Sequence, residues 1–399
     1  MRILKFVGAF LGTLLLILLL TFGFNTKALF VLFENSDDLQ EGQEWVARTT
    51  SLKTLTDYIG LHPERVAVVS RSAVNPDTSI RYSADVPHTM GTLSNFFLIT
   101  TYARLVEENL INPNELIPLS ETGRFQLPYI DHSHHETVKA VLADQGVLTP
   151  QNKVPLENLV QSAIIYNDLA ISDFLYYKLG IEAIRETYRL LNIQSTDLPL
   201  PFSGLYITLS PALHNASFDT HFASLRKLSE KAFRDKVLVA TKKYLQNKPF
   251  HRKVNAVFNE QQGLGIQFKQ RRDVLALFPK STAGELSRLV LAVQQEKLIS
   301  PAISQRVWEL LDWPFERQNI NSEFKYYGAL YDSRLGLLAG IDFGASTYSG
   351  EPFAQAVFFD SLQVAFWFHM SSNLMHQDYQ RRLMWDPALR SATLQEISK

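Results

Sequence analysis

A short polar stretch, residues 87–95, leads into a helix and contains side chains that could do chemistry. Thr92, Ser94 and Asn95 lie at its end, and the residues that follow repeat at the 3.6-residue period of a helix with one apolar face. A hydroxyl is a poor nucleophile until an adjacent base accepts its proton, so a hydroxyl placed here needs a partner. The stretch therefore predicts the place of a hydrolase nucleophile at the start of this helix.

Three other stretches contain groups that could bind ligands. Residues 131–136 (DHSHHE) combine imidazoles and carboxylates, which are ligands of transition metals. Adjacent residues rarely point at one ion, so we favour a solvated polar loop and predict no metal site. Asn215 begins a short glycosylation sequon, and the basic stretch 226–253 could face anionic lipid or wall polymer, although such a run is more often a solvated face.

Composition excludes several classes of function. The 399 residues are enough for a large core, and they include no cysteine, which removes disulfides, thiolate catalysis and thiolate zinc sites. The formal net charge is -1, so no overall field attracts nucleic acid. We predict neither a cofactor nor a nucleic-acid partner.

The N-terminus has the pattern of a membrane segment. Arg2 and Lys5 precede an uncharged run, residues 6–25, which is about the length that spans a bilayer of ~30 Å. Basic residues before the run favour a cytoplasmic N-terminus. A cleaved signal peptide is the alternative, but no A-x-A pattern follows. We predict a single-pass anchor in the cytoplasmic membrane over residues 1–33, with the remaining chain outside the cytoplasm.

The order of elements predicts the fold class. After a polar linker over 34–51, a short helix (52–59) precedes a hairpin (66–70 and 79–82) and the central helix. Helices then occupy the middle of the chain, and strands return at 324–327, 335–343, 354–359 and 364–370. Strands separated from helices indicate an α+β domain whose antiparallel sheet is built from both ends, with a helical subdomain. We place this domain at 52–385, with a helical insertion at about 212–280 and a tail at 386–399.

This layout resembles the serine β-lactamase and penicillin-binding-protein superfamily, class A β-lactamases most closely. Members have an opening strand pair, a helix with S-x-x-K, an S-D-N turn among helices and K-T-G on a late strand. Similar segments occur here at 79–99, 155–180, 281–301 and 326–344, followed by 350–359. The resemblance implies a serine-type hydrolase that works by acyl transfer.

The first motif lacks its lysine. Met90 and the helix face align Thr92 with the nucleophile and Asn95 with the lysine, so that S-x-x-K becomes T-L-S-N. A shift of two residues makes Ser94 the nucleophile and puts Phe97 at the lysine position. Neither side chain accepts a proton at neutral pH, and a positioned general base contributes roughly 10²–10⁴ in rate.

The other motifs are altered too. Tyr166-Asn167-Asp168 stands where S-D-N is expected, and Tyr166 is read equally well as an ordinary helix-end aromatic. Lys325-Tyr326-Tyr327 stands for K-T-G, which keeps the lysine but places a bulky Tyr327 where substrate would approach the strand. Ser333 and Arg334 resemble a pair that assists carboxylate binding in class A enzymes. The stretch 195–211, equivalent to the Ω-loop, has Asp197 as its only carboxylate and lacks the glutamate that positions water for deacylation.

Two functions follow from the resemblance. The first is a membrane-anchored serine hydrolase, impaired by these changes, with a β-lactam or cell-wall peptide as ligand. Its candidate catalytic residues are Thr92, Ser94, Asn95, Tyr166, Asp168 and Lys325, and its candidate substrate-binding residues are Tyr327, Ser333 and Arg334. The second is a non-catalytic relative that binds wall fragments or a partner. A third reading is an unrelated α+β protein.

Overall fold

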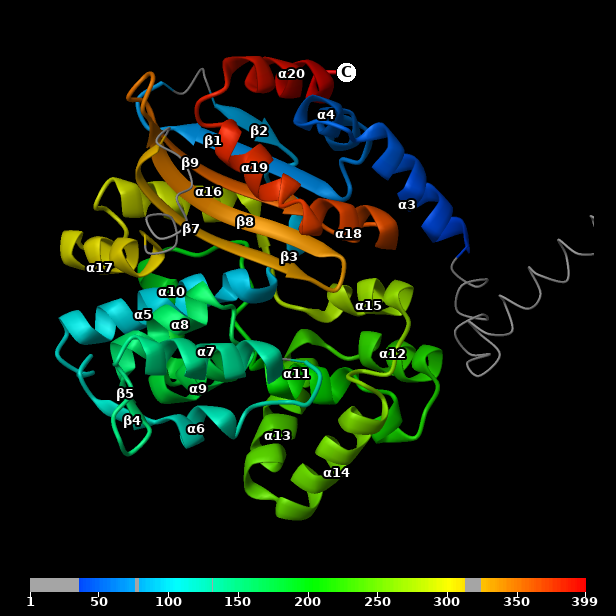
Figure 1. Cartoon of the computed structure of the whole chain (residues 1–399), viewed down its shortest axis with the longest axis vertical. Coiled ribbons are helices and arrows are strands. Elements are labelled where there is room, and N and C mark those ends of the chain that lie inside the picture. Colours follow the sequence, from blue (N-terminus) through cyan, green and yellow to red (C-terminus); the bar gives the residue numbers. More distant parts are fainter. Residues whose placement is uncertain (1–35, 76–78, 131, 313–323) are drawn as a thin grey trace, which may run out of the picture.

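One antiparallel sheet joins the two ends of the chain. The computed structural model describes residues 36–75, 79–130, 132–312 and 324–399. In this part of the chain five strands lie in the order β2-β1-β9-β8-β7 (Figure 1). Their bounds are β1 (Val66–Ser72), β2 (Ile80–Tyr82), β7 (Phe324–Arg334), β8 (Leu337–Ser346) and β9 (Pro352–Phe359). Since Val66 pairs with Phe359 and Ser72 with Phe353, the early hairpin and the late strands form one layer, which confirms the α+β prediction.

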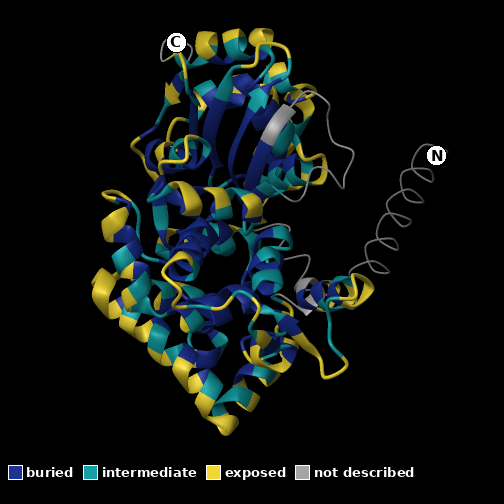
Figure 2. Ribbon diagram, turned by 90° about the vertical axis from the view of Figure 1, so that its left-hand side faces the viewer, coloured by how far each residue is buried: buried dark blue, intermediate teal, exposed yellow. Residues whose placement is uncertain are grey.

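Alternation along β1 explains why both faces of this sheet are covered. Ala67 and Val69 are buried in the large core shared with the helical half of the molecule. Val66 and Val68 point to the other face and pack in a second core. Successive side chains on a strand face opposite ways, so the run of four apolar residues that opens β1 needs a layer on each side. Figure 2 shows this burial along the sheet.

The second core is closed by helices from both termini. They are α3 (Ser36–Arg48), α4 (Leu52–Leu61), α18 (Val364–Ser372), α19 (Met375–Arg382) and α20 (Pro387–Ile397). The predicted linker at 34–51 is wrong where it is described, because α3 packs on α18 and buries Trp45. The predicted tail at 386–399 is likewise wrong, because α20 packs on α4 through Leu389.

The predicted strand at 364–370 is also wrong, because these residues form α18. Phe366 and Met370, four residues apart, are the buried side chains of this helix, and both join the second core. The run VAFWF favours a strand locally. That preference is overridden because the apolar side of a helix covers this face of the sheet.

The helical half surrounds one buried helix. α5 (Asn95–Glu107) is buried from its first residue to Leu105 and contacts α8 (Leu156–Ile165), α9 (Leu169–Leu179), α10 (Ile181–Leu190) and α17 (Pro301–Asp312). α16 (Ala283–Gln294) lies against the sheet on the same side. The remaining elements of this early helical region are β4 (Leu116–Pro118), α6 (Leu119–Gly123), α7 (His132–Asp144) and β5 (Lys153–Pro155).

The predicted insertion is a group of helices that extends from beside the sheet to the far end of the molecule (Figure 1). It comprises η3 (Ala212–His214), α12 (Phe218–Arg226), α13 (Glu230–Gln246), α14 (Lys248–Glu260), α15 (Phe268–Val274) and η4 (Leu275–Leu277). Before it, part of the stretch expected to be a loop at 196–211 forms α11 (Phe202–Leu209), all of whose residues are buried. A small ribbon of β3 (Pro87–Thr89) and β6 (Lys280–Thr282) then ties the end of the insertion to the approach to α5.

The anchor predicted over residues 1–33 lies outside the described residues. None of the helices in the described ranges has the length and apolar character needed to cross a membrane.

Candidate functional site

The hydroxyls predicted as nucleophiles lie in a 3₁₀ turn, η2 (Gly91–Ser94), that leads into α5. The backbone N–H of Met90 donates to Pro279 O at 3.0 Å, which fixes the start of this turn beside β6. Gly91 has φ +53° and faces β7 so closely that a Cβ there would overlap the Asp332 carboxylate. Glycine tolerates both the left-handed backbone and the close approach. The turn is therefore pressed against the sheet.

Thr92 is the hydroxyl that faces the sheet, and it is fully buried. Its Oγ1 donates to Asn167 Oδ1 at 2.8 Å, and its backbone N–H donates to Asp332 Oδ2 at 2.6 Å. Ser94 instead donates to Gly91 O at 2.8 Å, within its own turn. Asn95 Nδ2 donates to Ala163 O at 3.4 Å, so it points toward α8. Of these three residues, only Thr92 contacts polar groups both from the helical half and from the sheet.

The partner from the helical half is Asn167, the middle residue of the predicted Tyr166-Asn167-Asp168 motif. It sits between α8 and α9 with φ +49°, a left-handed conformation that Asn adopts more readily than most residues. Its Nδ2 donates to Tyr331 O at 2.9 Å, and its own carbonyl accepts from Arg334 Nη2 at 2.6 Å. Asn167 therefore joins Thr92 to β7.

The two flanking residues of that motif lie elsewhere. Asp168 is fully buried and is the N-cap of α9: its Oδ1 accepts from Ile171 N at 2.8 Å and its Oδ2 lies 2.8 Å from His135 Nδ1. Tyr166 lines a small cavity with residues of α7 and α8, together with Gln145. Asp168 thus positions the turn that presents Asn167, and the structure does not bring it or Tyr166 to Thr92 by a hydrogen bond.

The partners from the sheet are Asp332 and Arg334, near the end of β7. Asp332 is 1% exposed, and Arg334 Nε lies 3.7 Å from its Oδ1. Burial raises the pKa of Asp332, while the charge of Arg334 and hydrogen bonds from the backbone and the side chain of Thr92 act in the opposite direction. This carboxylate is consequently held between a guanidinium and a backbone amide, beside the buried Thr92.

The residues predicted as K-T-G lie further back on the same strand. The backbone of Lys325 pairs with Ala345, seven residues before Asp332, and its side chain lies outside the described part. Tyr327 packs on the other face of the sheet, where its hydroxyl contacts Tyr331 and Asp342. Ser333 is exposed. Of the predicted substrate-binding residues, only Arg334 therefore joins the group around Thr92.

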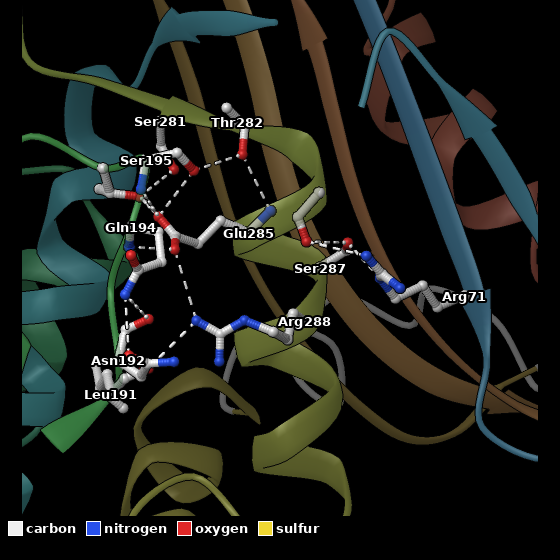
Figure 3. A network of polar contacts seen from close by, with 12 residues as sticks. Arg71, Leu191, Asn192, Gln194, Ser195, Ser281, Thr282, Glu285, Ser287 and Arg288 are labelled. Carbon is white, nitrogen blue, oxygen red and sulfur yellow. Dashed lines mark hydrogen bonds and ion pairs between the residues drawn. The ribbon is translucent and has the colours of Figure 1, made fainter. Parts of the chain in front are cut away.

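The stretch expected to correspond to the Ω-loop is tied to α16. Asp197 exchanges hydrogen bonds with the backbone of Lys280, at 2.8 Å through its N–H and 2.9 Å through Oδ2. The sequence T-A-G-E at 282–285 has the spacing of a capping box, and Thr282 is the N-cap of α16, because its Oγ1 accepts from Glu285 N at 3.1 Å. In a capping box the Glu285 carboxylate would accept a hydrogen bond from the backbone N–H of Thr282. Here it accepts hydrogen bonds from residues 194–196 instead (Figure 3).

The group around Thr92 has little to support proton transfer. Among described residues, the hydrogen bonds of Thr92 and Ser94 go to a carboxamide, a carboxylate and a carbonyl, and none goes to Lys or His. Of these partners only the Asp332 carboxylate can accept a proton. The described residues also contain no cluster of three His, Cys, Asp or Glu able to hold a metal ion.

Sequence reasoning missed two residues of this group. Asn167 is the middle residue of the predicted Tyr166-Asn167-Asp168 motif, in which only the two outer residues are predicted to be catalytic. The signal that could have found it is Asp168, because Asp is a preferred N-cap and here begins the next helix, α9. Asp332 gave no signal of its own. Its position follows from β7 ending just before Leu335 and Gly336, both at positive φ in the β-hairpin turn.

The sequence matches no protein-family model and no curated protein. Solved structures match the whole domain. A variant of the last common ancestor of Gram-negative bacteria class A β-lactamase aligns with TM-score 0.50 at 12% identity, over 84% of this chain and 98% of its own. The chain has the serine β-lactamase fold.

Two further structures with this fold align less closely. A β-lactamase from Sphaerobacter thermophilus has TM-score 0.49 at 12% identity and covers 87% of this chain and 97% of its own. PBP-A, solved as an acyl-enzyme complex with penicillin G, has TM-score 0.42 at 10% identity and covers 82% of this chain and 97% of its own. At 12% identity the likeness to the ancestral class A variant shows the fold alone and leaves the chemistry to the residues of this chain.

Proposed function

We propose that this protein is a β-lactamase-fold protein of the cell envelope that has lost acyl transfer and acts by binding wall material. The observation that supports the loss is the surroundings of Thr92: its hydroxyl is buried and donates to a carboxamide. A carboxamide takes no proton at neutral pH, so the hydroxyl is not activated. A substrate would also have to displace η2 from β7 to reach it.

An active hydrolase is the second candidate, because Asp332 is a buried carboxylate with a raised pKa beside Thr92. In that reading Thr92 Oγ1 bonds to the carbonyl carbon of a β-lactam or wall peptide while Asp332 takes the hydroxyl proton, and the amide C–N bond then breaks as Asp332 returns the proton to the leaving nitrogen. The Thr92 side chain also contacts Asp332. We favour the first candidate because the Thr92 hydroxyl donates to Asn167 Oδ1 at 2.8 Å, and Asp332 Oδ2 already accepts from the Thr92 backbone N–H at 2.6 Å.

Labelling with a fluorescent penicillin distinguishes the two. We expect the full-length protein, purified in detergent, to remain unlabelled at concentrations that label a penicillin-binding protein. The variants Thr92→Ala and Ser94→Ala should then match the wild type. Thr101→Ala is a matched control, because it removes another buried hydroxyl from α5, the helix that follows η2, and this hydroxyl donates to Phe97 O. Labelling that is lost in Thr92→Ala and kept in Thr101→Ala would establish the hydrolase instead.

The cellular placement rests on the apolar run at 6–25 and the basic residues before it. We propose that this run anchors the chain in the cytoplasmic membrane with the β-lactamase-like domain outside. A periplasmic reporter enzyme fused after Lys399 should be active, and the protein should resist extraction by alkaline carbonate. An inactive reporter, or release by carbonate, would reject this placement.

A further inference from the structure

The helical insertion carries an open groove on the side that faces the loop before α7. Two adjacent cavities, of about 660 and 390 Å³, lie between α13, α14 and residues 123–130. They share two lining residues, Tyr244 and His251, so the two cavities adjoin each other and together make up the groove. Its helices α13 and α14 lie in the part of the molecule furthest from the sheet, at the bottom of Figure 1.

The floor of the groove is a fixed pair of rings. Tyr244 is 1% exposed, and its hydroxyl lies 2.7 Å from Gln126 O and 2.9 Å from Asn255 Oδ1. His251 stacks on Tyr244 with ring centroids 4.4 Å apart and an angle of 17° between the ring planes. Asn255 Nδ2 lies 3.3 Å from His251 Nδ1. These contacts join α13, α14 and the loop, so the floor is preformed, as in most ligand sites.

One wall displays an aromatic ring to solvent. Tyr129 lines the larger cavity and is 60% exposed, and its backbone has φ +60°. A bulky residue in the left-handed region is uncommon and persists when the surrounding structure enforces it, often at ligand sites. An exposed tyrosine offers a flat apolar face together with a polar tip. This wall therefore suits a ligand that has a flat, partly apolar surface.

The charge of the groove has one sign. Its lining includes three cations, Arg124, Lys248 and Arg252, and includes no Asp or Glu. Amide side chains line the other cavity, where Gln126, Asn255 and Asn259 are found. The cations favour an anionic ligand, and arginine binds carboxylates with charge-assisted hydrogen bonds. Amides can both donate to and accept from hydroxyl and acetamido groups.

We propose that this groove binds an anionic glycan, with sugar rings on Tyr129 and carboxylates on the Arg124, Lys248 and Arg252 side. Two open cavities in a row suit a chain better than a small enclosed molecule. The choice of a wall glycan rests on the proposed function, whereas the position of the groove does not. A single-stranded nucleic acid would also combine charge with stacking, but the three amides and the predicted extracytoplasmic placement favour the glycan.

The test measures binding of glycan fragments to the full-length protein in detergent. The anionic probe is soluble glycan released from sacculi by a muramidase, and the neutral probe is an N-acetylglucosamine oligomer of equal length. We expect the anionic probe to bind at least tenfold more tightly than the neutral one. Tyr129→Ala and Arg252→Glu should each weaken its binding at least tenfold, with unfolding temperatures close to that of the wild type.

Matched controls come from exposed residues elsewhere. Tyr348, 72% exposed at the β8–β9 turn, is replaced by alanine, and the exposed Lys297, after α16, by glutamate. Both should bind the anionic probe like the wild type. No binding, equal binding of the neutral probe, equal losses in the control variants, or tighter binding of a DNA oligonucleotide would each overturn the proposal. Penicillin labelling is a separate readout, so failure of the groove and failure of the inactive-site proposal can be told apart.

Discussion

The residue that decides the chemistry is Thr92, and the structure shows what its neighbours do to it. Asn167 accepts its hydroxyl proton in a hydrogen bond, and Asp332 holds its backbone. Both are good partners for a buried threonine that stays in place, since buried polar groups need hydrogen bonds. In these contacts the Thr92 hydroxyl donates to a carboxamide, which is not a base at neutral pH. The arrangement therefore stabilises the closed contact between η2 and β7.

Gly91 is the residue whose substitution tests this closure. We expect Gly91→Ala to destabilise the protein far more than Gly146→Ala, a matched change at φ +66° with nothing within 4 Å of the new Cβ. The control variant Gly146→Ala should lose about 1–2 kcal/mol in its free energy of unfolding, because alanine is disfavoured in the left-handed conformation. Gly91→Ala adds the overlap with Asp332. Chemical denaturation measures both free energies of unfolding, and equal losses would show that η2 does not press on β7.

Asp342 predicts a pH dependence of stability. It is fully buried against Tyr327, Tyr331, Gln380 and Arg381, and burial raises its pKa from 3.8 to about 7. Between these values the folded state binds more protons than the unfolded state. The stabilising contribution of that proton is therefore fully present below about pH 3.8 and is lost as the pH rises through about 7.

Comparison with Asp342→Asn isolates this contribution. Relative to the variant, the wild type should lose stability between pH 4 and 8, by roughly 1.4 kcal/mol for each unit by which folding raises the pKa. Urea unfolding at several pH values measures the difference. A difference in free energy that stays constant over this range would contradict the shift.

At the level of elements, Glu285 joins α16 to the loop after α10. Burial acts to raise the pKa of Glu285, but hydrogen bonds from Thr196, Gln194 and Ser195 together lower it (Figure 3). The ionised carboxylate is therefore the form that holds the loop. A loop fixed in this way positions Asp197 against β6 and, through β3, the approach to η2.

Replacing Glu285 should release that loop. We expect Glu285→Gln to cost about 1–3 kcal/mol at pH 7, because one amide NH₂ then faces N–H and O–H donors. Glu107→Gln, an exposed change on α5, should cost little. Since the pKa of Glu285 is lowered, its contribution is present above pH 4.5 and is lost as the pH falls through the lowered pKa. Equal stability of the two variants at pH 7 would contradict this role.

At the level of the whole molecule, the sheet depends on both ends of the chain. β1 lies between β2 and β9, so the strands that follow residue 312 supply three of the five strands and one neighbour of β1. Without them the apolar side chains of β1, Ala67 and Val69 on one face and Val66 and Val68 on the other, lose the layer that buries them.

A chain that ends at residue 312 should therefore not fold. We expect it to show no cooperative thermal transition and to bind a hydrophobic dye, whereas the full-length protein in the same detergent unfolds cooperatively. Adding residues 313–399 as a separate chain could restore β9 and would be expected to recover part of the transition. A cooperative transition in the truncated chain alone would mean that the helical half folds by itself.

The sequence by itself determined the elements and their grouping. The 3.6-residue period identified α5, and the strand runs at 66–70 and 354–359 indicated a sheet built from both ends. Local signals also identified Thr282 as an N-cap. These features follow from short-range periodicity and capping, which each segment carries in its own residues.

Tertiary structure alone decided what faces Thr92. Asn167, Asp332 and Arg334 come from segments 75 or more residues away, and their convergence depends on the pairing of β7 with β8 and on the turn before α9. It likewise decided that VAFWF at 364–368 forms a helix, because the sheet face needed a cover. The surroundings of Thr92 and the helix at 364–368 both depend on long-range packing. A local pattern of residues does not indicate which distant side chain will fill a given space.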